Sequence, residues 1–255
     1  MINLFLVGAF VLGLIIGSFL NCLIWRLYKE ESLSGRSYCP HCRRTIAWYD
    51  NIPVLSFLFL GGRCRTCRAR ISWQYPLVEM ATALLFLLSF RQEMSSPDFF
   101  LLLLRDWSLI VALIIVFVYD FRWQLVPMAV VWPFSALILV CNLFLGVPVL
   151  QILFFAALGS GFFLVQYLLT KKQGVGEGDI WLGLMLGLAF PSASRLFLIM
   201  VVSYGLGAII SLVLIYGRKK KWRSRIALGP FLALGAIITL IWGEALINWY
   251  LSLFL

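Results

Sequence analysis

Charge is scarce in this chain of 255 residues: only 13% of the residues are Asp, Glu, Lys or Arg, and 62% are hydrophobic. Soluble globular domains carry about a quarter of their residues as charged ones. The shortage of charge and the mean hydropathy of +0.97 therefore exclude an ordinary soluble fold. They predict an all-α polytopic membrane protein whose core forms largely in lipid.

Histidine is almost absent, since His41 is the single one in the chain. A metalloprotease of the H-E-x-x-H type needs two histidine ligands, so that class is excluded. A Ser-His hydrolase would have to recruit His41 from a cysteine-rich loop, which disfavours that class too. The segment Gly159-Ser160-Gly161 is similar to a nucleophile motif. Small residues in an apolar helix are more typical of packing contacts, and we interpret this segment as one.

No basic region precedes the first apolar stretch, Asn3–Trp25, and the stretch lacks a small-residue cleavage site. A cleaved signal peptide is therefore not expected. The first basic residues, Arg26 and Lys29, come after the stretch. This order predicts that the N-terminus lies outside and that the first helix ends in the cytoplasm.

Apolar stretches separated by polar loops predict about eight transmembrane helices. They cover residues 3–25, 76–90, 99–119, 128–145, 149–169, 180–190, 196–216 and 230–251. The stretches 76–90 and 180–190 are shorter than the ~20 residues that cross a bilayer, so their ends are the least defined. We expect a first transmembrane helix (1–25), a small cytoplasmic loop domain (26–75) and a multi-helix transmembrane domain (76–255).

Basic residues are distributed unevenly between the two sides that this topology predicts. Of the 21 Lys and Arg residues, 18 fall in cytoplasmic loops, six of them between Arg218 and Arg225, and only Arg91, Arg105 and Arg195 fall outside. This bias follows the positive-inside rule and accounts for the net charge of +10 without a nucleic-acid partner. We expect the basic loops to face membrane lipids with anionic headgroups.

Four of the six cysteines form two C-x-x-C pairs in the loop domain, Cys39 with Cys42 and Cys64 with Cys67. Two such pairs can complete a tetrahedral thiolate site, which predicts a structural zinc ion. Two disulfides or free redox thiols are the alternatives, and a cytoplasmic location disfavours stable disulfides. Four thiolates leave no open position on the metal, so we expect no catalytic role for it and interpret His41 as a loop residue.

A glycine-rich run, Gly174–Asp179, places an acid at the edge of an apolar stretch, and a second acid, Asp120, ends another apolar stretch on the same predicted side. Ionisable residues at such positions are costly and therefore indicate function. Two close carboxylates share a proton, so that one activates water as a general base while the other polarises a peptide carbonyl. Asp120 and Asp179 are therefore a candidate pair for peptide hydrolysis without histidine or metal.

The spacing alone leaves a second interpretation open, in which both acids face lipid headgroups or pair with Arg122 or Lys171. Glu177 competes with Asp179 for the same role, because the flexible glycines around it leave its direction undetermined. Glu79, near the inner end of the second stretch, can pair with the basic loop or support the site.

These residues resemble a known family, the prepilin leader peptidases of type IV pilus, type II secretion and competence systems. The similar segments cover nearly the whole chain. They are, in order, Gly13–Asn21 with Arg26-Leu27, the two cysteine pairs, Ile71–Glu79, Asp120 with Leu125-Val126-Pro127, Gly176–Asp179 and Gly229–Ala236. Two positions depart from the usual pattern of the family: Trp181 stands where Lys is usual, and Met128 where Asp or Asn is frequent.

The resemblance implies a bifunctional, multi-pass enzyme of the bacterial cytoplasmic (inner) membrane, with its active site facing the cytoplasm. Asp120 and Asp179 would be the catalytic aspartates of a GxGD-type protease. The enzyme would cleave a prepilin or pseudopilin after a glycine and methylate the new N-terminal residue, usually Phe, with S-adenosylmethionine. The sequence names no residues that bind the methyl donor.

Two alternatives remain open. A peptidase without methyltransferase activity is typical of shorter relatives, such as preflagellin peptidases, which lack the long cysteine-bearing loop. A transporter or a non-enzymatic scaffold is the other alternative. Transporters often consist of repeated halves with broken helices, and no such repeat stands out in this sequence.

Overall fold

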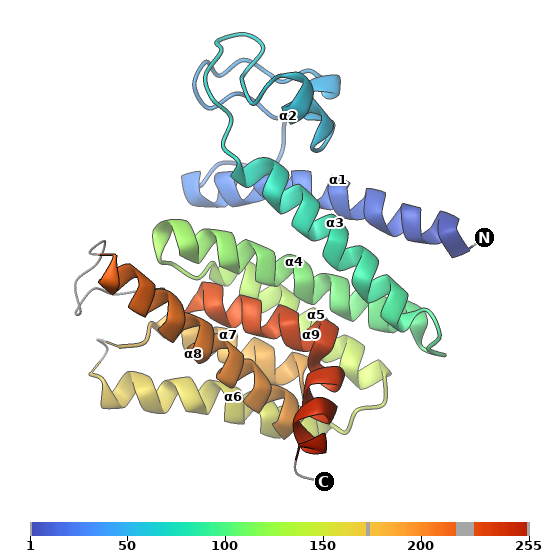
Figure 1. The fold of residues 1–255 in the computed structure, drawn as a ribbon, viewed down its shortest axis with the longest axis vertical. Helices are drawn as coiled ribbons and strands as arrows, with labels where there is room; N and C mark the ends of the chain where they lie inside the picture. Colours follow the sequence, from blue (N-terminus) through green and yellow to red (C-terminus); the bar gives the residue numbers. More distant parts are fainter. Residues whose placement is uncertain (1, 172–173, 218–226, 254–255) are drawn as a thin grey trace. The chain divides into compact units, whose positions relative to one another are not determined.

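The computed structural model describes residues 2–171, 174–217 and 227–253. Within these ranges the chain is helical, with helices α1 to α9, one short 3₁₀ helix (η1) and no strand (Figure 1). This confirms the predicted all-α class. Lys172 and the basic run Arg218–Arg225, which contributed to the charge bias, lie outside the described residues.

Five of the described helices are long and apolar enough to cross a membrane. They are α1 (Ile2–Lys29), α4 (Phe99–Trp123), α6 (Val149–Leu169), α8 (Ala193–Tyr216) and α9 (Gly229–Ser252). The shorter apolar α5 (Met128–Phe144), together with α3 (Gln74–Glu93) and α7 (Glu177–Ala189), occupies the remaining expected stretches. The chain is therefore a multi-pass membrane protein, in which α7 reaches only ~20 Å of the ~30 Å hydrocarbon core.

Several helix ends lie up to four residues from the expected positions, and two of these differences bear on the site. Helix α4 continues to Trp123, so that Asp120 lies near its end, and the chain leaves the helix through Gln124, which has a left-handed φ of 55°. Helix α7 begins at Glu177, so that Asp179 lies in its first turn. Apolarity alone does not mark these ends, because polar residues continue each helix beyond the apolar stretch.

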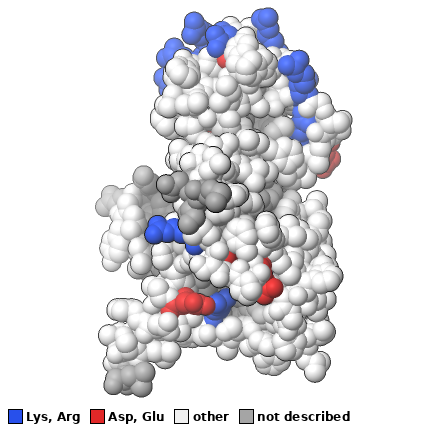
Figure 2. All heavy atoms as spheres, turned by 90° about the vertical axis from the view of Figure 1, so that its right-hand side faces the viewer, with Lys and Arg blue, Asp and Glu red and all other residues white. Residues whose placement is uncertain are grey.

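The chain forms two compact units, Met1–Met94 and Ser95–Leu255. The first unit contains α1, η1 (Trp48–Asn51), α2 (Leu55–Phe59) and α3, and the second contains α4 to α9. Lys and Arg side chains gather on one end of the surface in Figure 2, whereas most of the remaining surface in that view is uncharged. This distribution suits helices that are surrounded by lipid.

In the first unit, α1 packs closely against α3. A Cβ atom at Gly13 would lie 2.5 Å from the Cα of Ala83, so only glycine permits this approach. At the other end of the same segment, the amide of Asn21 donates a hydrogen bond to the carbonyl of Tyr75 over 3.1 Å. The Gly13–Asn21 segment therefore joins the two helices of this unit.

The apolar middle of the polar segment forms α2. Phe57 is its buried residue, and its ring lies 4.9 Å from that of Trp73 between centroids. The residue before α2, Val54, has a left-handed φ of 60° and donates its N–H to the carboxylate of Glu79 over 2.7 Å. Glu79 therefore holds a strained turn in place within the first unit, because a β-branched residue rarely adopts this φ.

In the second unit, α7 packs against α6 backbone to backbone. A Cβ atom at Gly183 would lie 2.5 Å from the carbonyl oxygen of Gly159, and one at Gly187 would collide with the backbone of Phe155. Gly159 is therefore a packing residue, as expected. The neighbouring Ser160 uses its hydroxyl within the helix, where it donates to the carbonyl of Ala156 over 2.9 Å.

A buried polar group holds the other end of α7. The amide of Asn142, on α5, donates to the carbonyl of Leu188 over 2.7 Å. Arg105 reaches the side-chain oxygen of Asn142 and forms an ion pair of 2.7 Å with the buried Asp106. Protein contacts thus fix this end of α7, although the helix is too short to be anchored by lipid alone.

Candidate functional site

Asp120 and Asp179 are brought together at one end of the second unit. Asp120 lies near the C-terminal end of α4, and Asp179 lies in the first turn of α7. Each side chain is almost fully buried, with 5% and 7% of its residue surface exposed. The two carboxyl groups lie near enough for the charge of Asp179 to affect Asp120, in addition to the larger effect of burial. The geometry therefore forms a pair of interacting carboxylates from two distant segments.

Backbone N–H groups orient both carboxylates. Gly176 donates to Oδ2 of Asp179 over 3.0 Å, which caps the start of α7. The backbone of Gly229, the first residue of α9, hydrogen-bonds to Asp120. A Cβ atom at Gly229 would lie 2.4 Å from Oδ2 of Asp120, so a side chain at this position would displace the carboxylate. Two helix N-termini thus point at the acids, and such termini favour negative charge.

Gly178 brings the α4–α5 loop up to α7. A Cβ atom at Gly178 would lie 2.6 Å from both the Cβ and the Cγ2 atom of Val126. By contrast, a Cβ at Gly176 would approach nothing more closely than 3.5 Å, the distance to the Asp179 carboxylate. Gly178 therefore serves internal packing, and Gly176 is the glycine that leaves open space beside the acids.

The structure distinguishes between the competing interpretations of the acids. Glu177 is exposed, whereas Asp179 is buried. The ion pairs found within the described ranges involve Asp50, Asp106 and Glu244, and none joins Asp120 or Asp179 to a cation. Glu79 lies in the first unit, where it binds the backbone of Val54. Pairing with Arg122 or Lys171 is therefore not observed in the described part of the chain.

The two departures from the family pattern are accommodated beside the pair. Trp181, the fifth residue of α7, packs against Trp132 of α5, with ring centroids 4.4 Å apart. The methyl group of Met128 would lie 3.6 Å from a Cβ at Gly178. Both residues therefore lie at the contact between α5 and α7, and neither position is one of the two acids.

Sequence reasoning missed Tyr204, on α8. Its phenol donates to the side-chain oxygen of Gln166, on α6, over 2.9 Å, and the charge of Asp179 acts on it. No motif surrounds Tyr204 in the sequence. The only indication in the sequence was that its hydroxyl group lies within a long apolar stretch, where polar groups are unusual.

The four cysteines of the two pairs also converge. The sulfur atoms of Cys39, Cys42, Cys64 and Cys67 all lie within 4.8 Å of one another. Tetrahedral zinc with Zn–S bonds of ~2.3 Å places its sulfur ligands ~3.8 Å apart. The Sγ atoms of Cys39 and Cys67 are 3.8 Å apart, so the residues present fit a zinc ion. His41 is exposed and does not belong to the cluster.

Each cysteine pair is held in a tight turn. The N–H of Arg43 donates to the carbonyl of Cys39 over 2.8 Å, and that of Arg68 donates to the carbonyl of Cys64 over 3.0 Å. Backbone N–H groups of Cys67 and Thr66 lower the pKa of the Cys64 thiol to about 7. A thiolate suited to binding metal is thus available at neutral pH.

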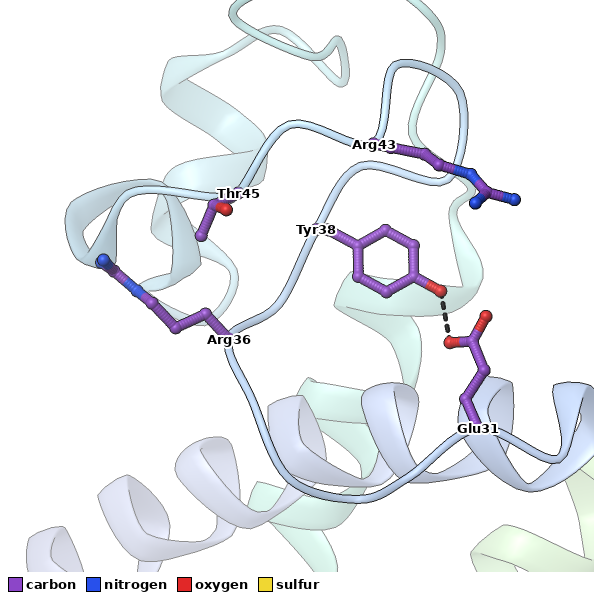
Figure 3. Close-up of a pocket in the computed structure, with 5 residues that line it drawn as sticks. All are labelled: Glu31, Arg36, Tyr38, Arg43 and Thr45. Atoms are coloured by element: carbon purple, nitrogen blue, oxygen red, sulfur yellow. Dashed lines mark hydrogen bonds between the residues drawn. The ribbon is translucent and has the colours of Figure 1, made fainter.

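A pocket of about 500 Å³ lies beside the first cysteine turn. Its walls are formed by Glu31, Arg36, Tyr38, Arg43 and Thr45 (Figure 3). The hydroxyl of Tyr38 donates to the carboxylate of Glu31. This depression is open to solvent, and its walls, apart from the half-buried Tyr38, are exposed.

Comparison with known proteins gives matches in both units. Residues 11–92 match the bacterial peptidase A24 N-terminal domain, and residues 107–212 match the type IV leader peptidase family. The first range lies within the first compact unit and the second range within the other. No solved structure matches the chain.

Several curated relatives are similar over nearly their whole length, and each is named prepilin leader peptidase/N-methyltransferase. The protein from Pseudomonas putida is 33% identical over 94% of this chain and 91% of its own. That from Aeromonas hydrophila is 34% identical over 96% of this chain and 93% of its own. The Bacillus subtilis protein is 32% identical, with coverage of 96% and 97%.

Proposed function

This chain belongs to the type IV leader peptidase family, and we propose that it removes the leader peptide of type IV prepilins or pseudopilins and then methylates the new N-terminal residue. The observation that carries the peptidase proposal is the buried pair Asp120 and Asp179, whose charges interact although the residues come from different helices. The names of its relatives support the second activity.

The proposed cleavage uses the two carboxyl groups in different protonation states. The ionised carboxylate takes a proton from water, and the water oxygen attacks the carbonyl carbon of the scissile peptide bond. The protonated carboxyl donates a hydrogen bond to the carbonyl oxygen, where negative charge develops. The C–N bond then breaks, a proton passes to the leaving amine nitrogen, and the pair again shares one proton.

The substrate would reach this site from the membrane, and the leader would lie on the cytoplasmic side of the bacterial inner membrane. The charge bias of the loops supports this orientation. Gly176 supports access to the acids, because its exposed backbone leaves room for an extended peptide. Anionic lipids are the expected neighbours of the basic loops.

The methylation requires a donor, and the relatives' names imply S-adenosylmethionine. The donor supplies a methyl group on a sulfonium: the N-terminal amine nitrogen takes the methyl carbon, the electron pair of the broken C–S bond stays on sulfur, and the amine releases one proton. Cys39, Cys42, Cys64 and Cys67 would hold a structural zinc ion, whose role is to fix the loops of the first unit.

A cleavage assay with matched acids tests the peptidase proposal. We expect Asp120→Asn and Asp179→Asn to lower the rate of leader removal by at least about a thousandfold, because each removes one of two proton-transfer groups. Glu177→Gln, two positions from Asp179 but exposed, should retain nearly full activity. Each variant would be purified in detergent and its prepilin product measured by mass spectrometry. Leader removal at the native rate by both aspartate variants would refute the dyad.

A further inference from the structure

We propose that the apolar stretch between the two cysteine turns, Ile52–Leu60, inserts into the cytoplasmic leaflet of the membrane, where it contacts lipid acyl chains and anionic headgroups. The stretch carries no charge and contains α2. It belongs to a segment that the charge pattern assigns to the cytoplasm, yet its contacts within the first unit place it beside membrane helices. The inference does not depend on the proposed enzymatic activity.

The apolar face of α2 points away from the rest of its unit. Leu55, Leu58 and Phe59 have the i, i+3, i+4 spacing of one helix face, and they are between 52% and 86% exposed. On the other side of the helix, Phe57 is buried, and its ring packs against that of Trp73. An exposed apolar face of this kind marks a surface that contacts a membrane or another protein.

The depth of α2 along the membrane helices follows from two contacts. The N–H of Val54, just before α2, donates to the carboxylate of Glu79. A Cβ atom at Gly17 would lie 2.7 Å from the Cα of Glu79, so Glu79 lies level with Gly17 of α1. Arg26, the first charged residue of α1, follows Gly17 by nine residues, or ~14 Å along the helix. Because a glutamate side chain bridges much less than this distance, α2 begins on the membrane side of Arg26.

The backbone of the stretch suits contact with hydrocarbon, which accepts polar backbone groups only when the protein pairs them. The N–H of Val54 is bonded to a carboxylate, and Pro53 before it has no N–H. At the other end, the N–H groups of Leu60, Gly61 and Gly62 all donate to carbonyls of α2, over 2.9 to 3.0 Å. The N–H groups at both ends of α2 are therefore satisfied without water.

Basic and aromatic residues follow this apolar face in the chain. Arg63, Arg68 and Arg70, around the second cysteine turn, are exposed and form no ion pair within the described ranges. Trp48 and Trp73 are also exposed, and tryptophan is enriched where proteins meet the headgroup layer. Lys and Arg side chains gather at one end of the surface, with uncharged areas among them (Figure 2). Cations beside an apolar face are complementary to a leaflet that contains anionic lipids.

A photoreactive residue in place of Phe59 tests the contact with lipid. The full-length protein with benzoylphenylalanine at this position would be placed in nanodiscs of phosphatidylethanolamine and phosphatidylglycerol, irradiated and analysed by mass spectrometry. We expect the mass of one phospholipid to be added. Benzoylphenylalanine in place of Phe154, exposed on α6, is the positive control. In place of His41, exposed in the first cysteine turn, it should add no lipid.

The position of the crosslink decides between the possible neighbours of α2. Crosslinks from position 59 to a peptide of the second unit or of another copy of the chain would overturn the proposal. Absence of a lipid adduct at position 59, when position 154 forms one, would overturn it as well. Zinc content equal to that of the native protein would show that the substitution leaves the cysteine turns folded.

The headgroup of the captured lipid tests the role of the arginines. Phosphatidylglycerol should form a larger share of the adducts at position 59 than of the bilayer, because Arg63, Arg68 and Arg70 attract anionic lipid. The double variant Arg68→Ala with Arg70→Ala should lower this share towards that of the bilayer. A share equal to that of the bilayer in the protein with all its arginines would refute the charge complementarity.

Discussion

At the scale of single residues, the candidate dyad depends on glycines as much as on acids. A side chain at Gly229 would displace the Asp120 carboxylate, and a side chain at Gly178 would collide with Val126. The acids supply the chemistry, whereas the glycines let three segments come close enough for the acids to meet. A sequence motif that combines glycine and aspartate therefore describes packing as well as catalysis.

We predict that Gly178→Ala lowers both stability and leader cleavage. Its Cβ would lie 2.6 Å from Val126, so the α4–α5 loop must move away from α7. Overpacking of this kind costs ~1–3 kcal/mol. Thermal unfolding in detergent and the cleavage rate would measure the two effects.

Two further variants distinguish the collision with Val126 from a general effect of replacing glycine with alanine. Gly205→Ala should be neutral or slightly stabilising, because a Cβ at Gly205 meets nothing within 4 Å and alanine favours a helix. The double variant Gly178→Ala with Val126→Gly should recover part of the lost activity. Unchanged activity of Gly178→Ala alone would contradict the steric argument.

At the scale of elements, α7 is a short helix with a local cap at its N-terminal end and a neighbouring helix bound to its C-terminal end. Its N-terminus carries Asp179 and is capped by Gly176, while its last carbonyls receive the amide of Asn142. Between these ends, glycines bring its backbone against α6. A helix of this length is not positioned by the bilayer, so its register depends on protein contacts.

The two cysteine turns form the other element with a defined ligand. We predict that the purified protein contains one zinc ion per chain and that Cys42→Ser removes it, because three thiolates do not complete the tetrahedral site. Cys22→Ser should retain the metal, since Cys22 lies on α1, outside the cluster. Elemental analysis of the purified proteins would measure the zinc content.

Loss of zinc should also loosen the polar segment of the first unit. Limited proteolysis is expected to cut Cys42→Ser between residues 30 and 72 and to spare Cys22→Ser, since a small polar segment relies on its metal for order. A native protein without zinc, or Cys42→Ser with a full complement of it, would refute this role of the cluster.

At the scale of the whole molecule, the distribution of charge sets the expected orientation in the membrane. The polar segment of the first unit carries nine of the basic residues, and the proposed topology places it in the cytoplasm. The same topology places the loop between α3 and α4 outside. The side of the membrane on which each loop lies is open to direct measurement.

We predict that Ser32→Cys and Ser95→Cys are labelled from opposite sides of the membrane. Both positions are exposed, one after α1 and one between α3 and α4. In intact spheroplasts, an impermeant maleimide should add label to Ser95→Cys only, and in inverted vesicles to Ser32→Cys only. The unaltered protein gives the background of the native thiols. Labelling of both positions from one side would contradict the proposed orientation.

The sequence by itself determined the class of the molecule. Hydrophobicity and the distribution of basic residues are properties of the chain, and they govern directly how it inserts into a bilayer and in which orientation. The sequence also identified the four cysteines, because each pair is recognisable from its short spacing, and the two pairs converge in the structure. The acids were identifiable as costly charges next to apolar stretches. These features require no knowledge of how distant segments pack.

Only the tertiary structure decided which acids meet and what surrounds them. It buried Asp179 while exposing Glu177, and it placed Tyr204 within the electrostatic reach of Asp179. It also assembled a pocket from Glu31 to Thr45. Such arrangements depend on long-range packing between helices, and apolar helices that all look alike in sequence carry little information about which of their faces touch.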